Sequence, residues 1–290
     1  MSPAAPVTVV RESYGPIERL VFTPVDPPKG ASMSVFRIGD TVIDTGGSRV
    51  TDAVLDTLAE RPIRRILLTH QHEDHVGNLG PIFARFGALP VHAPRALLHF
   101  LPSFRTVPPY RHVYWGPPHP LPTEPLLGYD DGDRFDLDAV AIEAMHTPGH
   151  TPPHHVFVVR DAGSTYVIAG DLYSSKPLDA FLESAVDDTI LSYRRVASLE
   201  GELTLLPTHG WVRPDARALL NDAADWLARE AEAIETDALA LGTRDPIRIA
   251  ESRYGHDRTM RISQGEMGPS VFVRSVLDPV RALPASPISS

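Results

Sequence analysis

Short apolar runs alternate with turn signals along most of the chain. The runs are rich in Val, Ile and Phe and are bounded by Gly, Pro or Asp, which is typical of β-strands. Segments 129–133 and 159–163 have the Gly and Asp content of turns. The pattern predicts strands at 19–22, 33–38, 41–43, 66–68, 140–144, 156–159, 166–169 and 203–206.

Helical periodicity occurs between these runs. Residues 50–59 place Val50, Val54 and Leu58 on one face, and residues 216–234 carry a longer apolar stripe behind Asp215, a candidate N-cap. Shorter helices are expected at 247–254 and 270–277. Strands mixed with helices predict a layered α/β or α+β fold.

Residues 101–125 differ from the rest because they hold eight prolines with aromatic residues between them. Regular structure is not expected there. Two interpretations stay open: a loop that covers a binding site, and a surface excursion packed by its own aromatic side chains.

Length and composition limit the organisation of the chain. Its 290 residues, 42% of them hydrophobic, suit one large domain with an appended segment. We expect a catalytic domain over 1–235 and a helical extension over 236–290, with a disordered tail from 282. The first residues do not resemble an export signal and no apolar run could span a membrane, which predicts a cytoplasmic protein.

Charge and cysteine content exclude several classes of site. The formal net charge of −10 is unfavourable for binding nucleic acid, which needs a basic surface. The sequence has no cysteine, so disulfides and thiol catalysis are excluded. Any metal ligands must be His and carboxylate side chains, which suit zinc, iron or manganese.

The densest group of candidate ligands is the run THQHEDH at 69–75. It follows the apolar run 66–68, so it lies where a predicted strand ends and a loop opens. His70, His72, Asp74 and His75 fall within six residues, and a loop can fold all four around one point. Imidazole and carboxylate groups at this density predict a site for divalent metal ions.

Three later segments repeat the arrangement of a ligand after an apolar strand. His150 lies in TPGH at 147–150, Asp171 in GD at 170–171, and His209 in THG at 208–210. Because strand ends gather at one edge of a sheet, these side chains are expected to converge. By spacing alone His146, His154 and His155 could also reach a metal.

The ordered motifs HQHEDH, TPGH, GD and THG resemble those of the metallo-β-lactamase-fold hydrolase superfamily. The resemblance covers roughly residues 15–235 and implies a four-layer αββα sandwich with metals at its rim. It implies that His70, His72 and His150 hold one ion and that Asp74, His75 and His209 hold a second. Asp171 would bridge the two ions.

The same resemblance assigns supporting positions. It selects His150 among the neighbouring histidines, so His154 and His155 are expected to support the ligands or lie at the surface. Residues 43–47, IDTGG, resemble the early turn of the superfamily, where Asp44 is expected to be structural rather than a ligand.

The implied activity is hydrolysis by a hydroxide that bridges two divalent ions, most simply zinc, with iron or manganese as alternatives. Asp74 would both bind metal and accept a proton from the attacking water. A small ester, thioester or lactone is the expected substrate, and the protein is expected to act without a membrane or nucleic-acid partner. The oligomeric state stays open, with a homodimer among the options.

Departures from subfamily patterns narrow the substrate. The segment after Asp171 lacks the Gly-Cys-Gly-Arg stretch of hydroxyacylglutathione hydrolases, and the third motif reads TPGHTPPHH, which argues against classical glyoxalase II activity. A phosphodiesterase or nuclease, a mononuclear iron sulfur dioxygenase and a non-catalytic regulatory protein of the same fold are the alternatives. Substrate contacts are expected from Tyr173, Lys176, Tyr114 and Trp115, with Arg194 or Arg195 as further candidates for an anionic group.

Overall fold

The computed structural model describes residues 6–25, 31–98, 107–121, 126–137 and 140–278. The chain divides into two compact units, and each is described by itself. Unit 1 comprises Met1–His146, His155–Gly170 and Thr204–Pro214. Unit 2 comprises Thr147–His154, Asp171–Leu203 and Asp215–Ser290. The expected tail from 282 lies outside the described residues.

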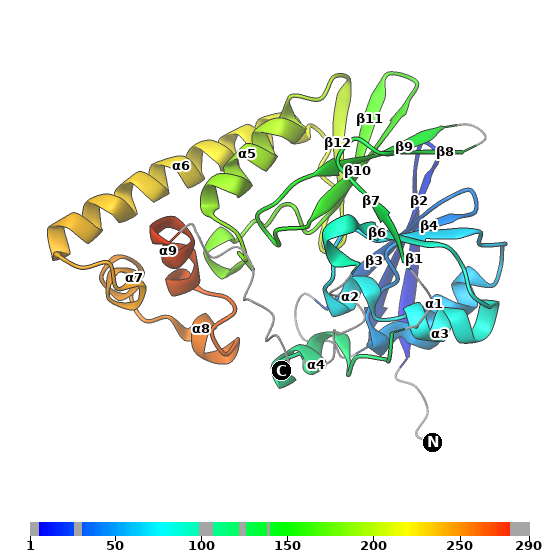
Figure 1. The fold of residues 1–290 in the computed structure, drawn as a ribbon, viewed down its shortest axis with the longest axis horizontal. Helices are drawn as coiled ribbons and strands as arrows, with labels where there is room; N and C mark the ends of the chain where they lie inside the picture. The colour runs from blue at the N-terminus through cyan, green and yellow to red at the C-terminus, as the bar shows by residue number, and fades with distance from the viewer. Residues whose placement is uncertain (1–5, 26–30, 99–106, 122–125, 138–139, 279–290) are drawn as a thin grey trace. The chain divides into compact units, whose positions relative to one another are not determined.

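The first sheet of unit 1 has seven strands in sequence order (Figure 1). Neighbours from β1 to β4 are antiparallel, whereas β4 to β7 are parallel. The parallel half places the ends of β4, β5 and β6 at one edge, where the segment of candidate ligands at 69–75 begins. The strands are β1 (Val7–Tyr14), β2 (Ile17–Pro24), β3 (Met33–Ile38), β4 (Thr41–Ile43), β5 (Arg65–Leu67), β6 (Val91–Pro94) and β7 (Leu127–Tyr129).

The second sheet has five strands in the order β12-β11-β10-β9-β8. Strands β8 to β11 are antiparallel neighbours, and Ala162 and Gly163 turn the chain between β10 and β11 with positive φ angles of 46° and 87°. The strands are β8 (Arg134–Asp136), β9 (Ala141–His146), β10 (His155–Asp161), β11 (Ser164–Gly170) and β12 (Glu202–Pro207).

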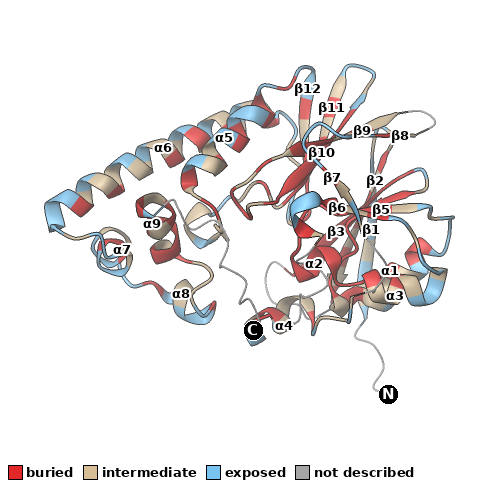
Figure 2. Ribbon diagram, viewed as in Figure 1, coloured by how far each residue is buried: buried red, intermediate tan, exposed pale blue. Residues whose placement is uncertain are grey.

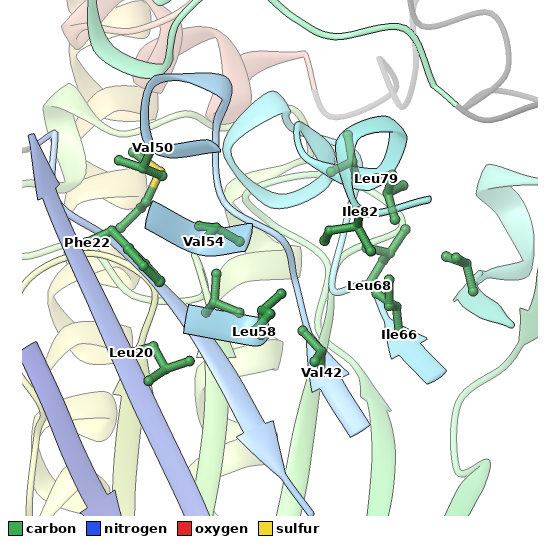
Figure 3. Packing of buried hydrophobic residues seen from close by; sticks show 14 of the residues in the cluster. Leu20, Phe22, Val42, Val50, Val54, Leu58, Ile66, Leu68, Leu79 and Ile82 are labelled. Carbon is green, nitrogen blue, oxygen red and sulfur yellow. The ribbon is translucent and has the colours of Figure 1, made fainter. Parts of the chain in front are cut away.

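From β2 to β6 the first sheet has buried residues on both faces. Successive residues of a strand point to opposite faces, so Ile66 and Leu68 join one apolar cluster while Leu67 joins the other. One cluster packs the sheet against α1 (Thr51–Leu58), α2 (Glu73–Val76) and α3 (Leu79–Phe86) (Figure 3). The other packs it against Phe157 and Ile168 of the second sheet. Unit 1 is therefore a helix–sheet–sheet sandwich.

Unit 2 is built on helices. Helix α5 (Val186–Ala197) lies beside α6 (Ala216–Leu241), and buried residues recur along α6 at spacings of three, four or seven positions, which keeps them on one face (Figures 1 and 2). Arg253 of α7 (Pro246–Tyr254) joins α6 through Glu230 at 2.7 Å and Asp237 at 2.9 Å. Helices α8 (Arg258–Ile262) and α9 (Pro269–Leu277) follow.

The predicted mixed α/β class, with two sheets and a C-terminal helical region, is confirmed. No helix in the described part of the chain has the length and apolar character needed to cross a bilayer. The boundary expected at residue 235 stays a prediction; α6 itself continues to Leu241 rather than ending at 234.

Two local predictions were wrong. Helix α4 (Pro109–Trp115) lies inside the Pro-rich segment, because Pro109 occupies the first turn, where no backbone N–H is needed, and the next six residues contain no proline. Asp215 stands at the N-cap position of α6 but makes no capping hydrogen bond, since its φ of 57° and ψ of 38° place it in the left-handed region.

Candidate metal centre

The segment of candidate ligands at 69–75, here called the ligand loop, runs from the end of β5 into α2, is buried, and is hydrogen-bonded to the turn after β4. His70 and His75 are fully buried, and His72 and Asp74 are at most 5% exposed. The His75 carbonyl accepts hydrogen bonds from the Thr45 backbone N–H at 2.7 Å and the Thr45 hydroxyl at 2.9 Å. The loop therefore has a fixed backbone, which a preorganised set of ligands requires.

Asp44 orients His75. It lies at the end of β4 with φ of 57°, is fully buried, and its Oδ2 accepts from His75 Nδ1 at 2.7 Å. Its carboxylate also accepts from the Thr69 backbone N–H at 2.8 Å and the Thr69 hydroxyl at 2.9 Å. A proton fixed on Nδ1 leaves Nε2 as the donor atom of His75. Asp44 thus contacts the predicted ligand His75, and its supporting role stays a prediction.

His209 is fixed in the same way from another part of unit 1. It follows β12, and its Nδ1 donates to the Ser32 carbonyl at 2.8 Å. Its Nε2 then faces Asp74 Oδ2 at 2.8 Å. The Trp115 ring stacks on His209 with centroids 4.9 Å apart and an interplanar angle of 25°. Residues far apart in the sequence thus meet at Asp74.

Unit 1 therefore gathers five of the seven predicted ligands into two neighbouring sets. Donor atoms of Asp74, His75 and His209 lie within 4.8 Å of one another, and so do donor atoms of His70 and His72. The His70 and His75 rings, with centroids 3.9 Å apart, connect the two sets. Imidazole nitrogens and a carboxylate, with their orientation set by neighbouring acceptors, fit divalent zinc, iron or manganese.

The other two predicted ligands lie together in unit 2. His150 Nε2 is 3.4 Å from Asp171 Oδ2. His154, fully buried, links their two segments: its Nε2 accepts from the Asp171 backbone N–H at 3.2 Å, and its Nδ1 lies 2.9 Å from the Thr147 hydroxyl. His154 thus joins the segments of the two predicted ligands His150 and Asp171, and its supporting role stays a prediction.

The loop of His150 packs closely on α5. Gly149 has φ of 146°, and a Cβ there would lie 2.4 Å from Thr189 Oγ1. Ser192 donates to the Pro148 carbonyl at 2.7 Å, and the Glu183 N–H donates to the His150 carbonyl at 3.1 Å. Only glycine allows this approach, which explains the Gly of the TPGH motif.

The predicted substrate contacts have different surroundings. Tyr114 and Trp115 belong to α4 in unit 1, beside His209. Tyr173 and Lys176 belong to unit 2, where the Tyr173 ring lies 6.0 Å from that of Tyr193 and Lys176 is exposed. Their binding roles stay predictions. Arg194 forms an exposed ion pair with Asp225, and Arg195 is exposed.

One buried ion pair beside the ligands was not predicted. Arg111 of α4 donates to Glu73 Oε2 at 2.8 Å, with side chains 6% and 2% exposed. Burial raises the pKa of the Glu73 carboxyl above its ordinary value, and the Arg111 charge opposes that rise. The sequence shows that Glu73 lies between two candidate ligands. It does not show the partner, because Arg111 lies 38 residues away in a segment where no regular structure was expected.

This sandwich, with histidines and an aspartate at the strand ends, defines a class of metal-binding fold. Residues 38–209 match the metallo-beta-lactamase superfamily, and the chain belongs to that family.

Individual relatives are more distant. The chain is 28% identical over 179 residues to a hydroxyacylglutathione hydrolase of Aeromonas salmonicida, covering 61% of this chain and 59% of the relative. It is 30% identical over 129 residues to an atrochrysone carboxyl ACP thioesterase of Passalora fulva, covering 42% and 31%. The matched part of the chain thus spans about three fifths of the hydrolase's length and about a third of the thioesterase's length.

Among solved structures, a beta-lactamase domain protein from Burkholderia ambifaria aligns with a TM-score of 0.71 at 16% identity. The alignment covers 96% of this chain and 89% of that protein. At this identity the likeness concerns the fold alone.

Proposed function

We propose that the protein is a metal-dependent hydrolase in which His70, His72 and His150 would hold one divalent ion and Asp74, His75 and His209 would hold another, with Asp171 as a further ligand. The observation that carries this proposal is the oriented donor set of unit 1, where Asp44 and the Ser32 carbonyl fix the Nδ1 atoms of His75 and His209. The order of the motifs and the family add His150 and Asp171. Zinc is the ion we expect.

Chain connectivity supports the addition of the last two ligands. Asp171 directly follows Gly170, whose carbonyl accepts from the Thr208 N–H at 3.0 Å, next to His209. The segment of His150 begins directly after His146 and ends directly before His155, which pair with each other across β9 and β10.

When bound, two divalent ions would lower the pKa of water and polarise the bond to be cleaved. The protein supplies orientation and proton transfer. The Asp74 carboxylate, next to His209 Nε2, accepts the proton of the attacking water. Burial of the ligand loop keeps bulk water away and strengthens these interactions.

The substrate we propose is a small thioester, with esters and lactones as related acyl compounds. The names of the matched relatives, a hydroxyacylglutathione hydrolase and an acyl-carrier thioesterase, support acyl transfer from sulfur to water. The half-buried aromatic ring of Trp115 beside His209 offers an apolar surface for an acyl group.

Metal analysis and a substrate panel test the proposal together. We expect about two zinc ions per chain and turnover of thioesters in preference to bis-aryl phosphates. Asp74→Asn should reduce kcat by about a hundredfold or more, while Asp52→Asn, an exposed change on α1, should leave it unaltered. One iron per chain, or full activity in Asp74→Asn, would contradict the proposal.

A further inference from the structure

We infer that the buried ion pair between Arg111 and Glu73 positions helix α4 against the metal-ligand loop, which makes α4 a fixed aromatic wall that determines acyl-group preference. The inference about preference rests on the proposed function. The inference about positioning concerns unit 1 alone and can be tested without activity.

The ion pair lies at the point where α4 meets the ligand loop. Glu73 begins α2 and stands between His72 and Asp74 in the sequence, while Arg111 lies in the first turn of α4. Glu73 belongs to neither donor set found among the described residues. A buried carboxylate without a metal needs a cationic partner, because an uncompensated charge in the interior is strongly destabilising. Arg111 is that partner.

The far end of α4 is fastened independently. Arg49 donates to the Val113 carbonyl, and the Ser48 hydroxyl donates to the Pro117 carbonyl at 2.5 Å. A Cβ at Gly47 would lie 2.8 Å from the Trp115 carbonyl oxygen, and one at Gly116 would lie 2.3 Å from Ser48 Oγ. Backbone packed this closely, with polar contacts at both ends of the helix, favours a fixed wall over a mobile lid.

The fixed helix carries an aromatic surface to the ligands. Trp115 stacks on His209, whose Nε2 faces Asp74, and the Tyr114 ring lies 5.9 Å from that of Trp115. An apolar acyl or aryl group is the ligand chemistry that such a wall recognises, so its placement should act on KM for long acyl chains more than on kcat.

A purely structural ion pair would stabilise unit 1 without influencing where Trp115 lies. The two roles therefore differ in two measurements: the solvent accessibility of Trp115 in the metal-free protein, and the ratio of KM values for long-chain and acetyl thioesters. The chain has three tryptophans, so Trp211→Phe and Trp226→Phe leave Trp115 as the single tryptophan, which can be excited apart from the tyrosines.

The experiment compares Arg111→Met, Arg111→Lys and the double variant Arg111→Met/Glu73→Gln in this background. We expect acrylamide quenching of Trp115 in the metal-free protein to rise about twofold in Arg111→Met and in the double variant. KM for a long-chain thioester should rise about tenfold, with KM for the acetyl thioester nearly unchanged. Arg111→Lys keeps the charge, so its quenching of Trp115 and its KM for the long-chain thioester should both lie between those of the wild type and Arg111→Met. Arg95→Met, which breaks an exposed pair with Asp130, is the control and should change neither.

The outcomes separate the two proposals. If Arg111→Met does not fold, the double variant leaves no unpaired charge and gives the answer. Unchanged quenching in a folded variant overturns the positioning role. Increased quenching with an unchanged KM ratio overturns the role in acyl preference. A wild-type protein without thioesterase activity refutes the proposed function and with it the acyl preference, whereas the quenching result still decides the positioning role.

Discussion

Replacement of Asp44 by Asn tests whether the metal centre depends on the orientation of His75. Asn fits the left-handed backbone at this position, where Asp44 has φ of 57°, so the substitution adds little backbone strain. The Asn carbonyl can still accept from the Thr69 N–H, but an amide NH₂ replaces Oδ2. In the wild type, Oδ2 accepts a hydrogen bond from His75 Nδ1–H at 2.7 Å. In the variant, the NH₂ is a donor and faces the same Nδ1–H.

Two donors facing each other force His75 to move its proton to Nε2 or to turn away. Either response removes the Nε2 lone pair from the metal. The desolvation cost of an unsatisfied buried donor is about 1–3 kcal/mol. Loss of such an orienting partner typically lowers metal affinity about 10- to 100-fold, equivalent to about 1.4–2.7 kcal/mol.

Competition with a chromophoric chelator measures this affinity directly. We expect Asp44→Asn to weaken the more loosely held of two ions by at least about tenfold. Asp40→Asn, on the same β-hairpin, removes only a pair with the largely exposed Arg64 and should leave metal affinity unaltered. Affinity in Asp44→Asn within twofold of the wild type would refute the argument that this hydrogen bond fixes the ligand.

Two further predictions concern unit 2. Gly149→Ala places a methyl 2.4 Å from Thr189 Oγ1 at a φ of 146°, so it should lower stability by about 1–3 kcal/mol in thermal unfolding. Gly163→Ala, also at positive φ but with no described atom within 4 Å, should cost less; equal losses would mean that contact with α5 is unimportant. The hydrogen bond from Arg253 lowers the pKa of Glu230 below its ordinary value of 4.5. The ionised carboxylate therefore stabilises the fold above pH 4.5, and this stabilisation disappears as the pH falls through the lowered pKa. Glu230→Gln should therefore be less stable than wild type in urea at neutral pH and equal to it in acid; a difference that persists in acid would contradict this origin.

Elements with a regular apolar pattern could be predicted from the sequence. The strands at 33–38 and 41–43 have the predicted bounds, and the helix at 270–277 differs from α9 by one residue. Strands β1, β6, β7 and β8 were missed, and the sequence of the first two shows why. The residues of β1 are intermediate or exposed, and β6 lies in a four-residue run that ends in proline, so neither gives a clear signal from apolar residues.

The candidate ligands stand out in the sequence because each group of them follows an apolar strand, whereas most of the groups that contact them do not stand out. Ser32 contributes only a carbonyl to His209, and every residue type has one, so its identity contains no signal. Arg111 lies in a segment whose prolines predict irregular structure, although its partner Glu73 stands among the ligands. His154 was one of several neighbouring histidines, and only its contact with the Asp171 N–H distinguishes it.

This division follows from how the two kinds of residue act. A ligand must have a particular donor atom at a particular strand end, so chain order and side-chain type both constrain it. An orienting group must only present an acceptor or an opposite charge at about 3 Å, and any segment that the fold brings near can supply it. In this protein Asp44 at the end of β4 and a carbonyl before β3 do so for two predicted ligands, and a side chain from α4 does so for Glu73, which stands between predicted ligands. Substitution of these supporting groups, more than of the ligands themselves, therefore tests whether the fold and the chemistry are connected as proposed.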